Sequence, residues 1–98
     1  MGPPGLTCAV SHGDGSVTLT VAGDVDLSTS PKLAVALEEA QASGDPVVLD
    51  LAKATHFDSS GVAALVEAIK RGPITITCAG GIVRRVLEVC GFGDLIAD

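Results

Sequence analysis

Residues 47–70 constrain the fold of this chain more than any other stretch, because three different patterns follow one another there. The apolar run at 47–51 is typical of a strand buried on both faces. The polar stretch Ala52–His56 predicts a loop. Beyond it, apolar residues recur at i, i+3, i+4 and i+7, the spacing of an amphipathic helix, at Val62, Leu65, Val66 and Ile69. The chain therefore starts a helix shortly after the end of a buried strand.

Polar residues occupy the start of that helix. Asp58 suits the N-cap position, where its carboxylate accepts hydrogen bonds from the free N–H groups of the first turn. Ser59 then falls at the first helical position, at the exposed mouth of the strand–helix corner. A phosphate on Ser59 would meet the positive end of the helix dipole, and the charge of Asp58 would repel it. Phosphorylation is thus expected to change the surface charge without unfolding the helix. A second interpretation is that residues 58–60 only cap and turn the chain.

Two strands and a helix are expected before this unit. Leu6–Val10 and Val17–Val21 alternate apolar and polar residues around the turn Gly13–Gly15, which predicts a β-hairpin. Asp24 and Asp26 follow the second strand.

The helix after these two carboxylates has its own signals. Residues 28–30 offer caps, and Pro31 suits the first helical position. Residues 43–46 then end the helix. Its apolar stripe is Leu33, Ala36, Leu37 and Ala40.

After the central unit, residues 71–73 break the second helix. Ile74–Cys78 alternates in character and predicts a fourth strand. A third amphipathic helix is expected over 82–90, with Gly91 as its C-cap. Leu95–Ala97 is expected to form a last short strand.

The order β-β-α-β-α-β-α predicts an α/β domain, because right-handed crossovers would join strands that run mostly parallel. We expect a mixed sheet of four to five strands, with an N-terminal β-hairpin and helices packed on it. At 98 residues the chain is predicted to be one domain, 1–98, in which residues 1–5 form a flexible N-terminus.

Composition argues against several partners. The net charge of −6 and the aromatic content of 2% argue against nucleic acid, which attracts basic residues and stacks its bases on aromatic rings. The N-terminus lacks the basic start and apolar stretch of a signal peptide, and no apolar run approaches the ~20 residues of a membrane helix. We therefore expect a cytoplasmic protein that binds neither nucleic acid nor membrane.

The cysteines do not predict a disulfide framework. Cys8, Cys78 and Cys90 are an odd count without CxxC spacing. We interpret all three as small buried core residues, and nothing in the sequence supports a redox role.

Catalytic and metal chemistry lack their usual residues. His12 and His56 have no ligand partner at motif spacing, so no metal site is expected. No phosphate-binding glycine motif occurs. Hydrolysis by Ser59 would need a histidine base and an orienting acid in reach, and the G-x-S-x-G elbow is absent. Ser59 is therefore better suited to receive chemistry than to perform it, and we expect no enzyme activity.

The residues around this serine resemble a known signature. Val48–Leu51 (VLDL) followed by Phe57–Leu65 (FDSSGVAAL) resembles the STAS domain, the anti-anti-sigma factor family. Gly23–Asp26 (GDVD) is similar to that family's motif after the second strand. Val83–Phe92 looks like its third helix and closing corner. The resemblance runs from about Leu6 to Ile96.

The resemblance implies a function. Anti-sigma factor antagonists bind an anti-sigma factor kinase of the histidine-kinase-like ATPase type and release its sigma factor. The kinase uses its own ATP to phosphorylate a serine, which abolishes binding, and a serine phosphatase resets the switch. The antagonist itself needs no cofactor. By this resemblance the acceptor is Ser59, and its surroundings and the partner-binding residues are Asp24, Asp26, Asp58, Ser60 and Gly61.

The chain also departs from the family pattern. Ala63 stands where the family often has glycine, and the stretch Glu67–Pro73 looks short. The sequence ends at Asp98, where the family usually adds a fourth helix, so we expect that helix to be absent. A second hypothesis therefore remains: a STAS scaffold or regulatory subunit of a signalling or lipid-transport complex, with Ser59 unmodified.

Overall fold

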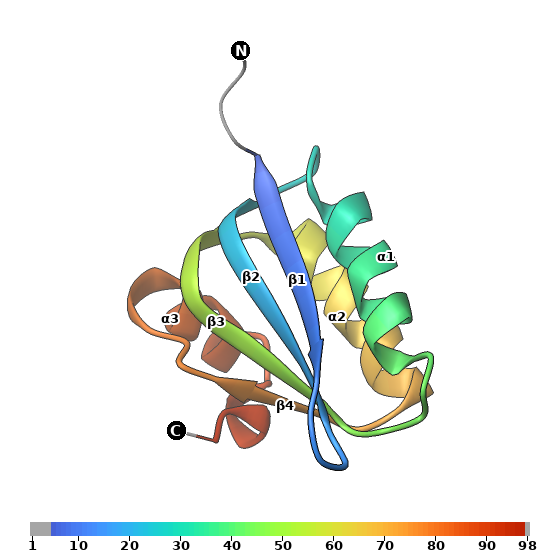
Figure 1. The fold of residues 1–98 in the computed structure, drawn as a ribbon. Coiled ribbons are helices and arrows are strands. Elements are labelled where there is room, and N and C mark those ends of the chain that lie inside the picture. The colour runs from blue at the N-terminus through green and yellow to red at the C-terminus, as the bar shows by residue number, and fades with distance from the viewer. Residues whose placement is uncertain (1–4, 98) are drawn as a thin grey trace.

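The sheet has four strands in the order β1-β2-β3-β4, of which β1 and β2 are antiparallel and the other neighbours parallel. Figure 1 shows the computed structural model, which describes residues 5–97. Its elements are β1 (Leu6–His12), β2 (Val17–Val25), α1 (Ser30–Gln41), β3 (Val47–Phe57), α2 (Ser59–Arg71), β4 (Ile74–Thr77), α3 (Gly81–Val89) and the 3-10 turn η1 (Gly93–Leu95). The predicted single α/β domain with an N-terminal hairpin is confirmed. The expectation for residues 1–4 lies outside the described residues.

The core lies on one face of the sheet. The register aligns Leu19 of β2 with Leu49 of β3 and Ile76 of β4, and all three are fully buried. Their neighbours in the chain on the other face, such as Thr18 and Thr75, are half-buried or exposed. Figure 1 shows α1 and α2 behind the strands, on the buried side. The expectation of a strand buried on both faces is therefore wrong, because the pattern at 47–51 marks one buried face.

The predicted loop Ala52–His56 is strand. β3 continues to Phe57 because β2 runs beside it to Val25, with register shifts after Thr20 and after Gly23. The last residue of β3 that pairs with β4 is Asp50, so the rest of β3 has a strand on one side only. The polar residues of Ala52–His56 therefore indicate an exposed part of the strand rather than a loop.

The helical stripe of α1 is confirmed, since Leu33, Ala36, Leu37 and Ala40 are its buried residues. α1 begins at Ser30, so Pro31 is its second residue and not its first. Thr29 takes the N-cap position without a side-chain capping bond.

The C-terminal region forms less strand than predicted. β4 ends at Thr77, and Cys78 adopts a left-handed conformation with φ of 63°. The expected last strand is reduced to an isolated parallel bridge between Ile76 and Ile96 that follows η1. The prediction of Gly91 as the C-cap of α3 is wrong by one residue, because Cys90 takes that position; Gly91 follows it in the left-handed conformation, with φ of 90°.

The prediction that all three cysteines are buried is wrong. Cys8 is half-buried, whereas Cys78 and Cys90 are exposed. Cys78 follows the end of β4, and Cys90 is the C-cap of α3, so neither points into the core as a regular strand or helix pattern would require.

The exposure of Cys78 predicts that Cys78→Ser has a small effect on stability. A buried sulfur would make the substitution destabilising, but at an exposed position we expect the free energy of unfolding to change by less than about 0.5 kcal/mol. Urea denaturation of both proteins measures the difference. A loss of about 2 kcal/mol would contradict the exposed placement of Cys78.

In residues 5–97, no helix is both long enough and apolar enough to cross a membrane.

Candidate functional site

The ends of β2 and β3 bring the two acidic motifs together. Val25 pairs with Phe57 in the parallel register, and the Asp58 N–H donates to the Val25 carbonyl at 3.1 Å. Asp26 and Asp58 therefore leave neighbouring strands at the same end of the sheet. We call this end of the sheet, residues 24–26 and 58–61, the Ser59 corner. This pairing puts the backbone of Asp26 next to that of Asp58, and the closeness of the Asp26 carboxylate to Ser59 stays a prediction of the family resemblance.

Asp58 forms the N-cap of α2, as predicted. Its carboxylate accepts a hydrogen bond from the Ser60 N–H at 2.9 Å and another from the Ser60 hydroxyl. Ser59 is the first residue of α2 and is exposed. Within the described chain its hydroxyl makes no side-chain hydrogen bond, whereas the hydroxyl of Ser60 is engaged by the cap. Of the two serines, Ser59 is thus the one that is exposed to solvent with its hydroxyl unengaged.

Asp26 organises the loop that leads from β2 into α1. Its carboxylate accepts hydrogen bonds from the Ser28 N–H at 3.0 Å, the Ser28 hydroxyl at 2.8 Å and the Thr29 N–H at 3.1 Å. The Thr29 hydroxyl in turn accepts from the Asp26 N–H at 2.9 Å and donates to the Asp24 carbonyl at 2.8 Å. The loop beside Ser59 is therefore held in one conformation by its own side chains.

Asp24, near the end of β2, is hydrogen-bonded to the neighbouring strand β3. Its exposed carboxylate accepts a hydrogen bond from the Thr55 hydroxyl on the neighbouring strand. Thr55 lies in the stretch that was predicted to be a loop, so it is absent from the predicted site residues. No local signal in the sequence identifies Thr55, because this part of β3 is strand only through its pairing with β2.

The carboxylates of Asp58 and Asp26 both stay ionised at neutral pH. The hydrogen bond from the Ser60 hydroxyl is the main cause that lowers the pKa of Asp58, followed by a smaller opposing effect of desolvation. The hydrogen bond from the Ser28 hydroxyl likewise lowers the pKa of Asp26. The corner therefore presents negative charge before any modification.

Gly61 fits this corner because it has no side chain. A Cβ at this position would lie 2.5 Å from Cγ1 of Val25 and 3.0 Å from Cε1 of Phe57. The first turn of α2 thus packs directly on the last residues of β2 and β3. This contact fixes where Ser59 stands relative to the sheet.

An acid titration tests the role of the Asp58 carboxylate. Its pKa in the folded protein is below the ordinary value of 3.8, so its contribution to stability is complete above that value and is lost as the pH falls. In Asp58→Asn the amide oxygen can still cap the helix but does not titrate. We expect the wild type to be more stable at pH 7 and the difference to shrink below pH 3.8. Urea denaturation across this range measures it, and a difference independent of pH would contradict the assignment.

No group of three or more His, Cys, Asp or Glu side chains within residues 5–97 is arranged to hold a metal ion.

The comparisons with known proteins identify the family. The family model described as "Mlab, STAS domain" matches residues 8–97, so the chain belongs to the STAS domain family. It is 29% identical over 86 residues to the anti-sigma-B factor antagonists of Listeria monocytogenes and Listeria innocua, which covers 82% of this chain and 75% of each relative.

Solved structures share the fold. An anti-sigma factor antagonist from Mycobacterium paratuberculosis has a TM-score of 0.85 at 23% identity, over 97% of this chain and 86% of that one. The anti-sigma factor antagonist SpoIIAA in its unphosphorylated form gives 0.80 at 17% identity, over 94% and 87% of the two chains. The Bacillus SpoIIAA in its phosphorylated form gives 0.72 at 16% identity, over 94% and 90%.

Proposed function

We propose that this protein is an anti-sigma factor antagonist whose binding to its target is switched off by phosphorylation of Ser59. The observation that carries the proposal is the exposed Ser59 at the start of α2, directly after the ionised Asp58 and at the same end of the sheet as the ionised Asp26. The names of the Listeria relatives support the antagonist function. The existence of SpoIIAA in both unphosphorylated and phosphorylated forms supports a switch of this kind.

The switch acts through charge. A phosphate adds about −1.5 to −2 charges at neutral pH. Asp58 and Asp26 already make this corner negative, and Asp58 directly precedes Ser59 in the chain. When the corner is pressed against a partner and water is excluded, an unpaired added charge costs several kcal/mol. That cost is enough to abolish a moderate affinity.

The chain is the substrate in this proposal and not the catalyst. An anti-sigma factor kinase of the histidine-kinase-like ATPase type supplies ATP and transfers its terminal phosphoryl group to Oγ of Ser59, which loses its proton. A serine phosphatase removes the group with water. The protein itself holds no cofactor and makes no direct contact with nucleic acid.

Phosphorylation with a defined kinase tests the proposal. The protein is incubated with ATP and the anti-sigma factor kinase of its source organism, and intact-mass and peptide mass spectrometry locate any phosphate. We expect one phosphate on Ser59, none on Ser59→Ala, and unchanged labelling of Ser60→Ala. Labelling of Ser60 instead, or of neither serine, would reject Ser59 as the acceptor.

The second candidate function is an unphosphorylated STAS scaffold or regulatory subunit. The description of the matching family model, which names Mlab rather than an antagonist, favours it. The same experiment separates the two functions. A protein that every such kinase from its source organism leaves unmodified belongs to the second class.

Asp26 is expected to contribute to partner binding. Asp26→Ala should weaken binding or phosphorylation about fivefold, roughly the 1 kcal/mol of a contributing interface residue, because it removes a carboxylate at the end of the sheet where α2 begins and loosens the Ser28–Thr29 loop. Asp14→Ala is the matched control, since Asp14 is exposed in the hairpin turn, away from the ends of β2 and β3. Equal effects of the two substitutions, measured by titration calorimetry, would remove Asp26 from the site.

A further inference from the structure

The two outer strands of the sheet, β1 and β4, differ in how far the chain covers their unpaired backbone groups. At the β4 edge, the Ala97 N–H donates to the Ile76 carbonyl at 2.8 Å, so the chain itself covers part of the edge. Within residues 5–97, no strand pairs with the outer edge of β1. β1 is seven residues long and contains no proline, lysine or acidic side chain, the residues that usually prevent edge-to-edge pairing. β1 therefore offers free backbone donors and acceptors to another strand.

The register of the hairpin decides which peptide groups are free. The Gly13 N–H donates to the Ser16 carbonyl at 2.9 Å, and the pairing continues without a shift to Leu6. Because hydrogen-bonded and non-hydrogen-bonded pairs alternate, the peptide groups of Ala9 point toward β2. Those of Cys8 and Val10 point outward, symmetrically on either side of Ala9.

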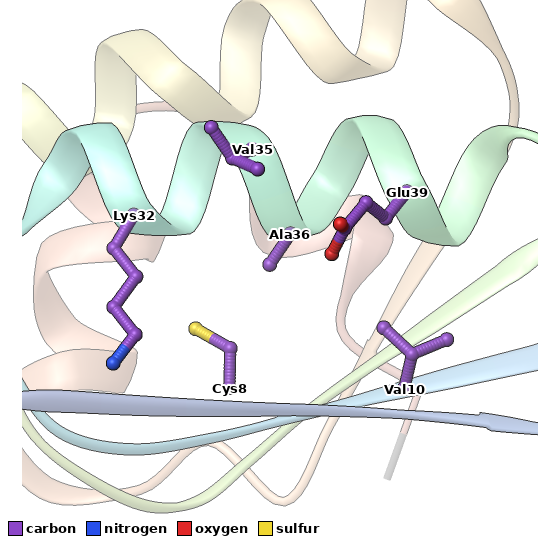
Figure 2. Close-up of a pocket in the computed structure, with 6 residues that line it drawn as sticks. All are labelled: Cys8, Val10, Lys32, Val35, Ala36 and Glu39. Carbon is purple, nitrogen blue, oxygen red and sulfur yellow. The ribbon is translucent and has the colours of Figure 1, made fainter.

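A hollow of about 330 Å³ lies between this edge and α1. In Figure 2, Lys32 lies toward the Cys8 end of the hollow, Glu39 lies toward the Val10 end, and Val35 and Ala36 lie between them. Val35 is 54% exposed, and neither Lys32 nor Glu39 forms an ion pair with a described residue. The hollow is lined by Cys8, Val10, Lys32, Val35, Ala36 and Glu39.

We propose that this edge binds a second copy of the same chain, with the two β1 strands antiparallel about a two-fold axis through Ala9. Cys8 would then pair with the partner's Val10, using the free peptide groups of both. α1 runs in the same direction as β1 (Figure 1), so the two α1 helices would also be antiparallel. Lys32 and Glu39 lie on either side of Val35 on α1. A two-fold axis that passes beside Val35 therefore places Lys32 of each copy opposite the partner's Glu39. The edge is complementary to itself in backbone and in charge.

The spacing of the helices agrees with this arrangement. Adjacent strands lie about 4.8 Å apart, and α1 lies over β1 and β2. Two such helices across the axis would be about 10 Å apart, within the usual range for packed helices. Val35 of each copy would be covered by α1 of the other copy, and the two four-stranded sheets would join into one continuous sheet. Ser59 follows β3, two strands from this edge, so the dimer leaves Ser59 of both copies open and does not depend on the proposed switch.

Charge exchange tests the interface. Sedimentation equilibrium of the full chain should show a dimer, and Lys32→Glu or Glu39→Lys should raise its dissociation constant about tenfold or more by placing like charges opposite each other. The double variant Lys32→Glu/Glu39→Lys should return to within about threefold of the wild type. Glu38→Lys, exposed on the same helix but outside the hollow, should have little effect. A monomer at all concentrations up to the millimolar range, or a double variant no better than the single ones, would overturn the proposal.

A disulfide tests the position of the axis. Ala9 would face the partner's Ala9 in a non-hydrogen-bonded pair, whose Cβ atoms are about 4.5–5.5 Å apart and can be joined by cysteines with small adjustment. In a Cys78→Ser/Cys90→Ser background, Ala9→Cys should form a covalent dimer under mild oxidation. The background alone and Thr7→Cys, which would not face itself, should not. Equal cross-linking of Thr7→Cys and Ala9→Cys would place the axis elsewhere and reject this pairing.

Discussion

Ser59→Asp is expected to weaken binding of the anti-sigma factor kinase by about tenfold to a hundredfold, whereas Ser59→Ala retains the wild-type affinity. The aspartate places a permanent negative charge at the start of α2, next to Asp58 and near Asp26. A charge that becomes buried and unpaired in an interface costs about 2 kcal/mol or more. The alanine removes only the hydroxyl, which makes no side-chain hydrogen bond to the described chain. Titration calorimetry with one kinase preparation gives both affinities.

Ser60→Asp and Ser59→Asn serve as controls for this result. Ser59→Asn has nearly the size of the aspartate without its charge, so its affinity should stay within about threefold of the wild type if charge is the cause. Ser60→Asp moves the charge by one residue and also disrupts the Asp58 cap, so it should lower stability as well as binding. If Ser59→Asp and Ser59→Ala bind equally well, the charge mechanism is wrong.

Gly61→Val is expected to lower the free energy of unfolding by about 3 kcal/mol. Even the first added carbon would lie 2.5 Å from the side chain of Val25 and 3.0 Å from the ring of Phe57. Both of these residues are buried, so neither can move aside without disturbing the core. Denaturation by urea, followed by far-UV circular dichroism, measures the loss.

Gly93→Val is the matched control for this substitution. A Cβ on Gly93 meets no atom within 4 Å, and its backbone is not in the left-handed region. We expect its stability to stay within about 0.5 kcal/mol of the wild type. If both valine variants are equally stable, the close packing of α2 on the corner does not restrict position 61.

The sequence predicted elements whose signals are local. Asp58 and Ser59 were placed correctly at the N-cap and first residue of α2, because capping chemistry and helical spacing both act within a few residues. The hairpin was predicted for the same reason, since alternation and turn glycines are neighbours in the chain. Leu33 and Leu37 followed from the 3.6-residue period of α1.

Features that depend on distant strands were not predicted. β3 extends through Ala52–His56 because β2 pairs with it, and no local pattern reports that pairing. The bond between Thr55 and Asp24 joins residues on two strands and needs the same information. Cys78 was expected inside the sheet because the alternation of apolar and polar residues in β4 continues for one residue beyond the end of the strand.

The most direct measurement of the central claim uses the modification itself. The protein is phosphorylated completely on Ser59, separated from the unmodified form, and both forms are titrated into the same anti-sigma factor kinase. We predict that the unmodified form binds, that the phosphorylated form binds at least about a hundredfold more weakly, and that phosphatase treatment restores the first affinity. Equal affinities of the two forms would contradict the account.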